Sequence, residues 1–326
     1  MKKIEKEIEI CQKDIENIKK EIEKAVIGQD DIVKNCLKAL LCHGHVLLEG
    51  VPGIGKTLIV RVLSMVSGCE FKRIQFTVDL LPTDIIGITT YDKVKGFYTI
   101  KGPIFANFVI ADEINRSPPK TQSALLEAMQ ERQVTIGKET FHIEEPFFVV
   151  ATQNPLESAG VYTLPEAQVD RFLLKLNVVY PSIEEEQDIL KTNISLRKLE
   201  AFGLKPVANS KKIIEMQDLT KRIFLSEDIE KYIVRLVDAT RNPEKYKIKL
   251  GEYIEYGGSP RASIGLFIAS KAEALINGYA FVTPQDVKKS AYEVLRHRIL
   301  LNYEGQAEGI KTDDIIKEIL SRVPIQ

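Results

Sequence analysis

A run of eight residues, from Gly50 to Thr57, has the types and spacing that bind phosphate, because it matches the pattern G-x-x-x-x-G-K-[ST]. Glycines let backbone N–H groups curl around a phosphate, and the start of a following helix adds its positive dipole end. Lys56 is expected to reach the β- and γ-phosphates, and the Thr57 hydroxyl to hold Mg²⁺. A glycine-rich turn without a ligand is the plainer interpretation. The apolar segment before the run and the helical spacing after it favour a nucleoside triphosphate site.

A pair of acids, Asp112 and Glu113, follows the apolar segment 108–111. An acid at the end of a strand can lie near Mg²⁺ in a nucleotide site. Its neighbour Glu113 can polarise a water molecule for in-line attack on the γ-phosphate. The two acids could instead cap the next helix, but their position at a strand end downstream of the phosphate-binding run favours chemistry.

Asn154 follows a third apolar segment, at 147–150. Its amide could hydrogen-bond the attacking water or the γ-phosphate. Taken alone, however, Asn154-Pro155 is typical of a simple turn. Its weight as a candidate therefore depends on the other residues of the site.

The segments around these residues alternate between strands and helices from about 26 to 180, which predicts a parallel α/β sheet. Ligands gather at the carboxyl ends of such strands, so the acid pair is expected beside the phosphate-binding run. Hairpins are predicted at 87–100 and 133–143. Ser117 as N-cap and Pro118 in the first turn predict a helix through Gln130. The expected strands of the sheet are 45–49, 71–76, 107–111, 147–151 and 173–178.

Three parts are expected along the chain. Residues 1–25 form an amphipathic helix, since apolar side chains recur at steps of four and three. Its stripe could be a coiled-coil seam, but packing on its own domain or a neighbouring subunit is favoured. Residues 26–181 form the nucleotide-binding domain, and 182–326 an all-helical domain that begins with a capping box at Ser182–Glu185. Its helices are expected near 183–200, 210–223, 227–241, 261–278, 284–300 and 311–321.

The composition of the 326 residues, 44% hydrophobic and 28% charged, is that of a soluble globular protein of two domains. The net charge of −1 and the lack of a basic block give no support for nucleic-acid binding. No apolar run could span a bilayer and the start is too charged for a signal peptide, so a cytoplasmic location is expected. The four cysteines predict a reduced compartment, and a metal site at Cys42–His45 is disfavoured because no second ligand pair lies nearby.

Taken together, these residues resemble the AAA+ ATPases and, within them, the MoxR family. The matching stretches follow the order and spacing of that family and cover nearly the whole chain after the first helix. The resemblance implies an α/β fold, with an AAA+ P-loop parallel sheet core and a C-terminal all-helical lid domain. The stretches are GHVLLEGVPGIGKT (44–57), IADEINRSPPKTQSALLEAMQER (110–132), ATQNPLESAGVYTLPEAQVDRF (151–172) and GGSPRA (257–262).

The resemblance also implies roles for single residues. Lys56 and Thr57 match the Walker A lysine and magnesium-binding hydroxyl, and Asp112 and Glu113 match the Walker B pair. ATP and Mg²⁺ are the implied cofactors, with Thr57 and Asp112 as the metal-binding residues. The implied nucleotide-binding residues are Val26, Ile27 and Gly28 near adenine, together with Gly50, Pro52, Gly53, Ile54, Gly55, Lys56, Thr57, Leu58, Asp112, Asn154 and Arg261.

Three residues match further catalytic positions of the family. Asn154 matches the sensor-1 residue, Arg171 the arginine finger delivered to the neighbouring subunit's ATP, and Arg261 sensor 2. Physical reasoning agrees, since guanidinium groups neutralise charge on the γ-phosphate in the transition state. Ser259 as N-cap and Pro260 in the first turn would place Arg261 at a helix start. A surface salt bridge is the alternative role for both arginines.

Two features are left open by the sequence. Arg116 could face a subunit interface. The hairpin at 87–100 is similar to the helix-2 insert of this clade, and the one at 133–143 to its pre-sensor-1 hairpin. In relatives such inserts touch substrates or neighbouring subunits, but Phe97 and Tyr98 could equally serve packing.

The implied function is ATP hydrolysis at the subunit interfaces of a homo-oligomeric ring, expected to be a hexamer. The ring would drive chaperone-like remodelling, maturation or cofactor insertion of a client protein, and a von Willebrand factor A-domain protein is the family's usual companion. One alternative is a nucleic-acid motor, against which the charge balance argues. Another is a nucleotide-gated scaffold with little turnover, against which Glu113 and Arg171 argue. A GTPase is disfavoured because Ile310–Asp313 lacks the leading polar residue of the guanine-reading motif.

Overall fold

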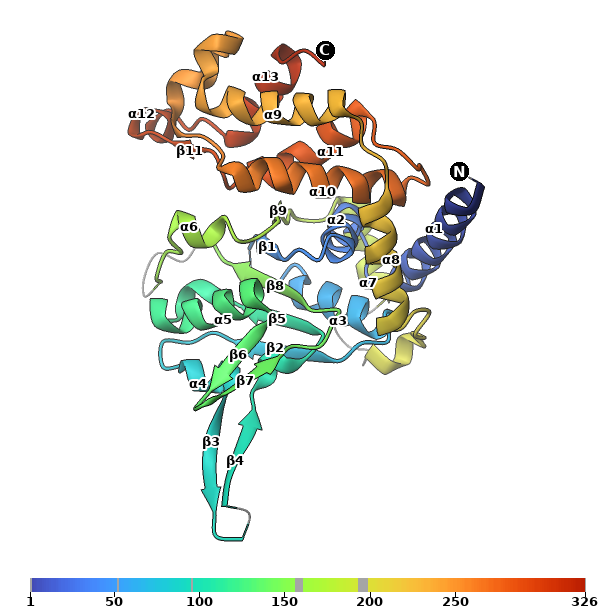
Figure 1. Ribbon diagram of the computed structural model, residues 1–326, viewed down its shortest axis with the longest axis vertical. Coiled ribbons are helices and arrows are strands. Elements are labelled where there is room, and N and C mark those ends of the chain that lie inside the picture. The colour runs from blue at the N-terminus through green and yellow to red at the C-terminus, as the bar shows by residue number, and fades with distance from the viewer. Residues whose placement is uncertain (1, 52, 95, 156–160, 193–198, 326) are drawn as a thin grey trace. The chain divides into compact units, whose positions relative to one another are not determined.

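Five strands form one sheet in the order β2-β5-β8-β1-β9 (Figure 1). The computed structural model describes residues 2–51, 53–94, 96–155, 161–192 and 199–325. β2 pairs with β5, β5 with β8 and β8 with β1, and each of these pairs is parallel. The predicted parallel sheet is confirmed. Its strands are β1 (Val46–Glu49), β2 (Phe71–Gln75), β5 (Phe108–Asp112), β8 (Phe148–Gln153) and β9 (Leu174–Asn177).

Both faces of the central strands are buried, which explains why their sequences are almost continuously apolar. On one face of β5, Val109 belongs to the same buried core as Leu125 of helix α5 (Pro119–Glu131). At the alternate position, the Phe108 ring meets the Phe148 ring edge-on, with centroids 5.5 Å apart. Packing on two faces holds the carboxyl ends of these strands at one edge of the sheet.

The contacts within the chain divide it into two units, each built from more than one segment of the sequence, so no single position separates them. We call them the nucleotide unit and the lid unit. The boundary expected between residues 181 and 182 differs from this division, because helix α7 (Ile183–Thr192) belongs to the nucleotide unit. The nucleotide unit comprises Asp14–Phe172 and Leu176–Glu215, and the lid unit comprises Met1–Lys13, Leu173–Lys175 and Met216–Gln326.

Two hairpins were expected in the nucleotide unit and both are present: β3 (Gly87–Asp92) with β4 (Gly96–Lys101), and β6 (Gln133–Ile136) with β7 (Glu139–His142). Further helices of this unit are α2 (Asp30–Leu41), α3 (Lys56–Val66), α4 (Pro82–Ile86) and α6 (Glu166–Val169), with short 3-10 turns η1 (Pro103–Phe105), η2 (Ile114–Arg116) and η3 (Leu199–Phe202). Helix α8 (Ser210–Arg222) begins in the nucleotide unit and continues past Glu215 into the lid unit.

The expected start of helix α5 was wrong by one residue. Pro118 is the N-cap, without a side-chain cap bond, and Pro119 is the first helical residue. Ser117 instead closes the 3-10 turn η2 and is fully buried. The turn occupies the three residues after the acid pair and ends at Ser117, so the cap of the following helix falls one residue later, at Pro118. The expected capping box at the start of α7 is confirmed, since Ser182 Oγ accepts the Glu185 N–H at 3.2 Å.

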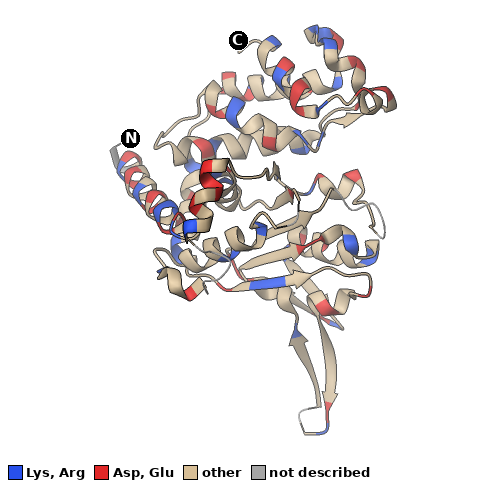
Figure 2. Cartoon of the chain, turned by 180° about the vertical axis from the view of Figure 1, so that it is seen from behind, with Lys and Arg blue, Asp and Glu red and all other residues tan. Residues whose placement is uncertain are grey.

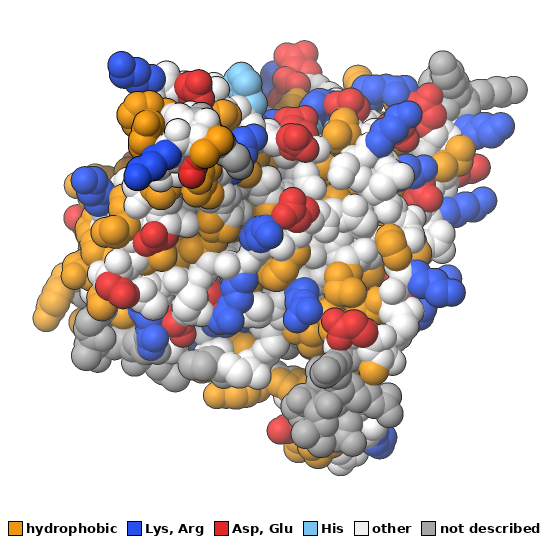
Figure 3. All heavy atoms as spheres, turned by 90° about the horizontal axis from the view of Figure 1, so that it is seen from below, with side chains coloured by type: hydrophobic (Ala, Val, Ile, Leu, Met, Phe, Trp, Pro, Cys, Tyr) orange, Lys and Arg blue, Asp and Glu red, His pale blue; other side chains and the backbone are white. Residues whose placement is uncertain are grey.

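The β3–β4 hairpin projects from the nucleotide unit (Figure 1) and carries few charges along its length (Figure 2). Phe97 is 79% exposed, and its ring lies 5.1 Å from that of Tyr91 on the opposite strand. Val94 at the tip is also exposed. Figure 3 views the face from which the hairpin projects, where hydrophobic side chains are visible among charged ones. Phe97 therefore packs against its own hairpin and not into the core.

Over residues 216–325 the regular structure of the lid unit is helical apart from one short ladder and an isolated bridge between Phe224 and Phe281, which corrects the expectation of an all-helical domain. Strands β10 (Ile254–Tyr256) and β11 (Leu300–Leu301) pair in an antiparallel manner. The helix starts expected at Ser226 and Thr283 are confirmed, since both side chains accept a backbone N–H of the first turn. The other elements are α9 (Glu227–Arg241), α10 (Pro260–Ile276), α11 (Pro284–Leu295), α12 (Tyr303–Ala307), α13 (Thr312–Arg322), η4 (Pro243–Tyr246) and η5 (Lys249–Tyr253).

The N-terminal helix α1 (Lys2–Ile22) buries its apolar stripe within this chain. Among its side chains Ile8, Cys11, Ile15 and Ile18 are each less than 5% exposed. This is the packing expected of a helix on its own chain, and it removes the stripe as a coiled-coil seam. Over the part of the chain that the structure describes, no helix has the length and apolar character required to cross a bilayer.

The imidazole of His45 is fully engaged inside the core. Its Nδ1 accepts the Val149 N–H at 3.0 Å, so Nε2 carries the proton and donates to the Met129 carbonyl at 3.2 Å. The ring also meets Phe147 edge-on. Burial lowers the pKa of His45 to about 4. The residue is a neutral core histidine, with both nitrogens used by the fold.

We expect acid to destabilise the protein through His45. The unfolded chain binds this proton at a pKa near 6.5 and the folded chain only near 4, so stability is lost as the pH falls between these values. The loss amounts to about 2–3 kcal/mol at the low end of that range. Urea unfolding at pH 7 and pH 4.5, for the wild type and His45→Gln, measures it. Equal losses in the two proteins would remove His45 as the cause.

Candidate functional site

The loop between β1 and α3 has the backbone conformation that its glycines were expected to supply. Gly53 and Gly55 have φ values of 85° and 81°, in the left-handed region that side chains disfavour. Apart from the chain neighbours, no atom of the described residues lies within 4 Å of where a Cβ would stand at either glycine, so the loop is open to a ligand. Gly55 is the N-cap of α3, whose first N–H groups face the loop. Pro52 lies outside the described residues.

Two side chains at the start of α3 reach the ends of neighbouring strands. The Lys56 ammonium donates to the carbonyls of Gly50, at 2.6 Å, and Gln153, at 3.3 Å. The Thr57 hydroxyl donates to Asp112 Oδ2 at 3.3 Å. The loop, the first turn of α3 and the carboxyl ends of β1, β5 and β8 therefore meet at one place, as the sequence predicted.

The Thr152 hydroxyl, near the end of β8, forms hydrogen bonds with both Asp112 and Glu113. It donates to Asp112 Oδ1 at 2.7 Å and accepts the Glu113 N–H at 2.9 Å. Glu113 has φ 58° and ψ 51°, a left-handed conformation that turns the chain sharply after β5. Sequence reasoning picked Asn154 from this strand end and missed Thr152. Side chains two residues apart on a strand share a face. Thr152, two residues before Asn154, could have been found from this alternation.

Arg73 and Gln75, on the edge strand β2, extend this network and were also missed. The register places Gln75 beside Asp112, and Arg73 lies two residues earlier on the same face. The Arg73 guanidinium donates through Nε and Nη2 to Asp112 Oδ2, at 3.0 and 2.8 Å. Its Nη2 also donates to Gln75 Oε1 at 2.5 Å. Polar residues at alternate positions of a strand paired with the acid-bearing strand are the only sequence signal for them.

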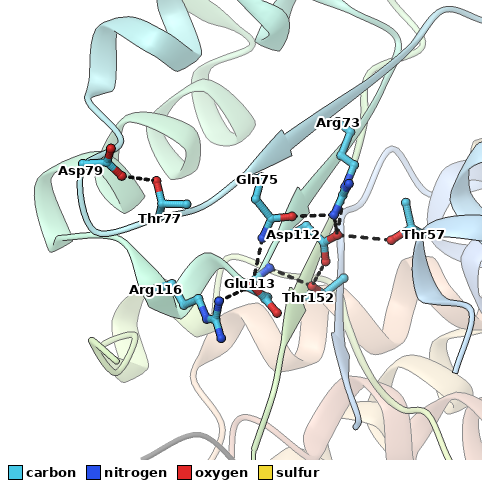
Figure 4. A network of polar contacts seen from close by, with 9 residues as sticks. All are labelled: Thr57, Arg73, Gln75, Thr77, Asp79, Asp112, Glu113, Arg116 and Thr152. Carbon is cyan, nitrogen blue, oxygen red and sulfur yellow. Dashed lines mark hydrogen bonds and ion pairs between the residues drawn. The ribbon is translucent and has the colours of Figure 1, made fainter. Parts of the chain in front are cut away.

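Glu113 is held by two side chains. Gln75 Nε2 donates to Glu113 Oε2 at 2.9 Å, and Arg116 Nη1 lies 3.2 Å from the same oxygen. The contacts form one continuous path from Thr57 through Asp112 and Arg73 to Gln75 and Glu113 (Figure 4). Arg116, whose role the sequence left open, thus forms an ion pair within its own chain.

A pocket of about 410 Å³ lies beside the loop, within the nucleotide unit. Val26 and Ile27, expected near adenine, line it together with loop residues of the predicted set. Gly28 instead packs against the Glu185 side chain. Part of the wall comes from Tyr180 and from α7, and of these two only α7 had been expected in the lid domain. The lining residues are Ala25, Val26, Ile27, Gln29, Gly53, Ile54, Gly55, Leu58, Ile59, Tyr180, Pro181, Glu186, Ile189 and Leu190.

The remaining candidates, Asn154, Arg171 and Arg261, come from three different parts of the chain. Asn154 is buried directly after β8. Arg171 is exposed, and its guanidinium donates to the Leu126 carbonyl of α5 at 3.1 Å, beside a pocket of about 270 Å³. Arg261 belongs to the lid unit, where its N–H donates to Ser259 Oγ at 3.2 Å. The helix start predicted at Ser259 is thereby confirmed.

The donor set fits a nucleotide with a divalent metal ion. The Thr57 hydroxyl and the Asp112 carboxylate are the hard oxygen ligands that Mg²⁺ prefers, and they lie 3.3 Å apart. An open glycine loop, a lysine and a helix N-terminus supply positive potential for phosphates. The apolar pocket beside them offers a flat base a dry surface. Glu113, next to Asp112, could orient a water molecule toward such a phosphate.

Comparisons with known proteins agree with this geometry. Residues 45–174 match the family described as "ATPase family associated with various cellular activities (AAA)", and residues 250–319 match the "AAA lid domain". The chain is 46% identical to Chaperone MoxR1 of Mycobacterium tuberculosis over 307 residues, which are 94% of this chain and 80% of that protein. It is 45% identical to the uncharacterized protein YeaC of Bacillus subtilis over 308 residues, 94% of this chain and 93% of that one.

A solved structure gives the same result for the fold. A crystal structure from Cytophaga hutchinsonii, named as a candidate ATPase, is similar with a TM-score of 0.93 and 45% sequence identity. The similarity covers 100% of this chain and 98% of that chain. Sheet, loop and lid therefore recur together in a related protein.

Proposed function

The chain belongs to the MoxR family of AAA+ ATPases, and we propose that it splits ATP between the subunits of a ring to remodel a client protein. Family membership makes it an ATPase with a chaperone-like kind of activity. The observation that carries the proposal is that hydrogen bonds, two of them through the Thr152 hydroxyl, join Thr57, Asp112 and Glu113 beside the open glycine loop.

Each residue of the loop region has a distinct part in binding. The backbone N–H groups around Gly53 and Gly55, with the Lys56 ammonium, hold the phosphates. Thr57 and Asp112 hold Mg²⁺, which when bound neutralises charge on the phosphates. The pocket lined by Val26 and Ile27 holds the adenine. The Lys56 ammonium donates to two backbone carbonyls in this structure. When ATP binds, anionic phosphate oxygens would replace these neutral acceptors and form stronger hydrogen bonds.

In hydrolysis, Glu113 orients the attacking water and accepts its proton. Asn154, at the end of the adjacent strand, hydrogen-bonds the water or the γ-phosphate. Arg261 senses that phosphate from the start of α10, so the state of the nucleotide biases the hinge between the two units. Because Gln75 and Arg116 hold Glu113 in this structure, the Glu113 carboxylate must turn away from them to orient the attacking water.

Assembly completes the site in this proposal. Arg171 is exposed and its guanidinium donates to a carbonyl of α5 in its own subunit, so it is accessible to a neighbouring subunit. Placed against the next subunit's γ-phosphate, its guanidinium would neutralise charge in the transition state. A hexamer is the expected ring. A client protein and a von Willebrand factor A-domain companion are the expected partners, and the exposed β3–β4 hairpin is available to touch either.

Light scattering tests the assembly. The Glu113→Gln variant, which should retain ATP, is expected to shift with ATP and Mg²⁺ from the mass of one 36.8 kDa chain to that of a hexamer. Lys56→Ala, which weakens phosphate binding, should remain small under the same conditions. A wild-type protein that stays monomeric while hydrolysing ATP at full speed would refute shared sites. Pull-down with the ATP-loaded Glu113→Gln variant identifies client and companion.

A further inference from the structure

Arg73 places a positive charge where the proposed function requires a metal ion. Its guanidinium donates twice to Asp112 Oδ2, the same oxygen that accepts the Thr57 hydroxyl. The other oxygen of Asp112 accepts from Thr152. We propose that Arg73 is a latch on Asp112 that competes with the divalent ion and, through Gln75, couples metal binding to the release of Glu113. This inference rests on the function proposed above.

The hydrogen-bond capacity of the Asp112 carboxylate supports competition. Each carboxylate oxygen has about two lone-pair sites, and Oδ2 already receives three N–H or O–H donors from Arg73 and Thr57. A metal ion that binds both Thr57 and Asp112 needs a lone pair of Oδ2, and the Arg73 guanidinium already donates two hydrogen bonds to that oxygen. The two cations also repel each other. Metal binding therefore requires Arg73 to loosen its hold on Oδ2.

The position of Arg73 makes this release possible. It lies on β2, which is the edge strand of the sheet, and its side chain is 51% exposed, whereas that of Asp112 is only 12% exposed. The guanidinium can therefore turn into solvent without opening the core. Because half of the side chain is in water, the ion pair is a modest one, and its loss costs little.

Gln75 extends the effect to Glu113. Its amide oxygen accepts from Arg73, and its amide nitrogen donates to Glu113 Oε2 (Figure 4). When Arg73 moves away, Gln75 loses the contact that orients its amide and holds Glu113 less firmly. Arg116 then remains as the other partner of Glu113, so metal binding loosens the Glu113 carboxylate and eases its turn toward water. Arg73 and Gln75 are thus positioning residues that link the two acids.

Metal binding measured directly tests the latch. Electron paramagnetic resonance counts free Mn²⁺ during titration of the protein with ADP present, so no hydrolysis is needed. Arg73→Gln is expected to bind Mn²⁺ about two- to fivefold more tightly than the wild type, as removal of a half-exposed competing charge predicts. Arg73→Lys, which keeps the charge, should stay near the wild type. Lys72→Gln, the same charge change one residue away on a side chain paired with Glu70, is the matched control.

The outcomes separate the latch from the proposed function. If Asp112→Asn binds Mn²⁺ as well as the wild type does, the metal site itself is wrong. If Asp112→Asn loses the metal and Arg73→Gln binds it no better than the wild type or Lys72→Gln, only the latch is wrong. Equal tightening by Arg73→Lys and Arg73→Gln would also overturn the latch, since charge would then not be the cause.

A double-mutant cycle tests the link through Gln75. Gln75→Leu should tighten Mn²⁺ binding in the wild-type background, because Arg73 loses the partner that helps to orient it. In the Arg73→Gln background the same change should have no effect on Mn²⁺ binding. Additive effects of the two substitutions would overturn the coupling, because they would show that Gln75 and Arg73 act separately.

Discussion

Replacing Glu113 with glutamine is expected to lower the rate of ATP hydrolysis about 10²- to 10⁴-fold while leaving ATP binding intact. An amide has nearly the same size as the carboxylate but cannot accept a proton from the attacking water. It also loses the ion pair with Arg116, while the hydrogen bond with the Gln75 amide can persist. Phosphate release measures turnover, and a fluorescent ATP analogue measures binding.

A matched control is available for this charge change. Glu139 is an exposed glutamate on β7 of the same unit, and Glu139→Gln should hydrolyse ATP at the wild-type rate. Near-normal turnover of Glu113→Gln would remove Glu113 from the catalytic role. Loss of both binding and turnover would show that the residue maintains the pocket and does not act on water.

Replacing Arg171 with alanine is expected to reduce hydrolysis by a comparable or larger factor, about 10³-fold or more, through the neighbouring subunit. In its own subunit the guanidinium is bonded to a carbonyl of α5, so its removal should leave folding and nucleotide binding nearly unchanged. Gln168, which lines the same pocket as Arg171, offers the control, and Gln168→Ala should keep most of the activity.

Complementation shows whether Arg171 acts across the interface. Glu113→Gln subunits keep Arg171, and Arg171→Ala subunits keep Glu113, so each variant alone has no complete site. In rings mixed at equal amounts, about a quarter of the head-to-tail interfaces combine an intact Glu113 with an intact Arg171. Mixing should therefore restore a measurable part of the activity. Two inactive variants that remain inactive when co-assembled would argue that Arg171 acts within its own subunit.

The parts of the site that sequence reasoning found are those whose residues are neighbours along the chain. The loop from Gly50 to Thr57 and the acid pair after β5 are each a short run with one physical purpose. Burial on both faces makes the strands apolar, so the strands and their carboxyl ends could be predicted before any contact was known. The expected cap at Ser117 failed because a 3-10 turn, which has no strong sequence pattern, intervenes.

Residues brought in from other strands were not predictable in this way. Arg73 and Gln75 look like ordinary polar residues of an edge strand until the register sets Gln75 beside Asp112. Thr152 is one hydroxyl among many until β8 lies next to β5. The assignment of α7 likewise depended on a contact, because its side chains line the pocket beside the loop despite following Pro181 in sequence.

The kind of chemistry was therefore readable from the chain, since a phosphate-binding loop and the acids after a buried strand depend on local backbone geometry. The control of that chemistry was not. Arg73 meets Asp112 across 39 positions of sequence, and Gln75 meets Glu113 across 38. Such meetings are set by strand order and register, which arise from the packing of the whole sheet and leave no local pattern behind.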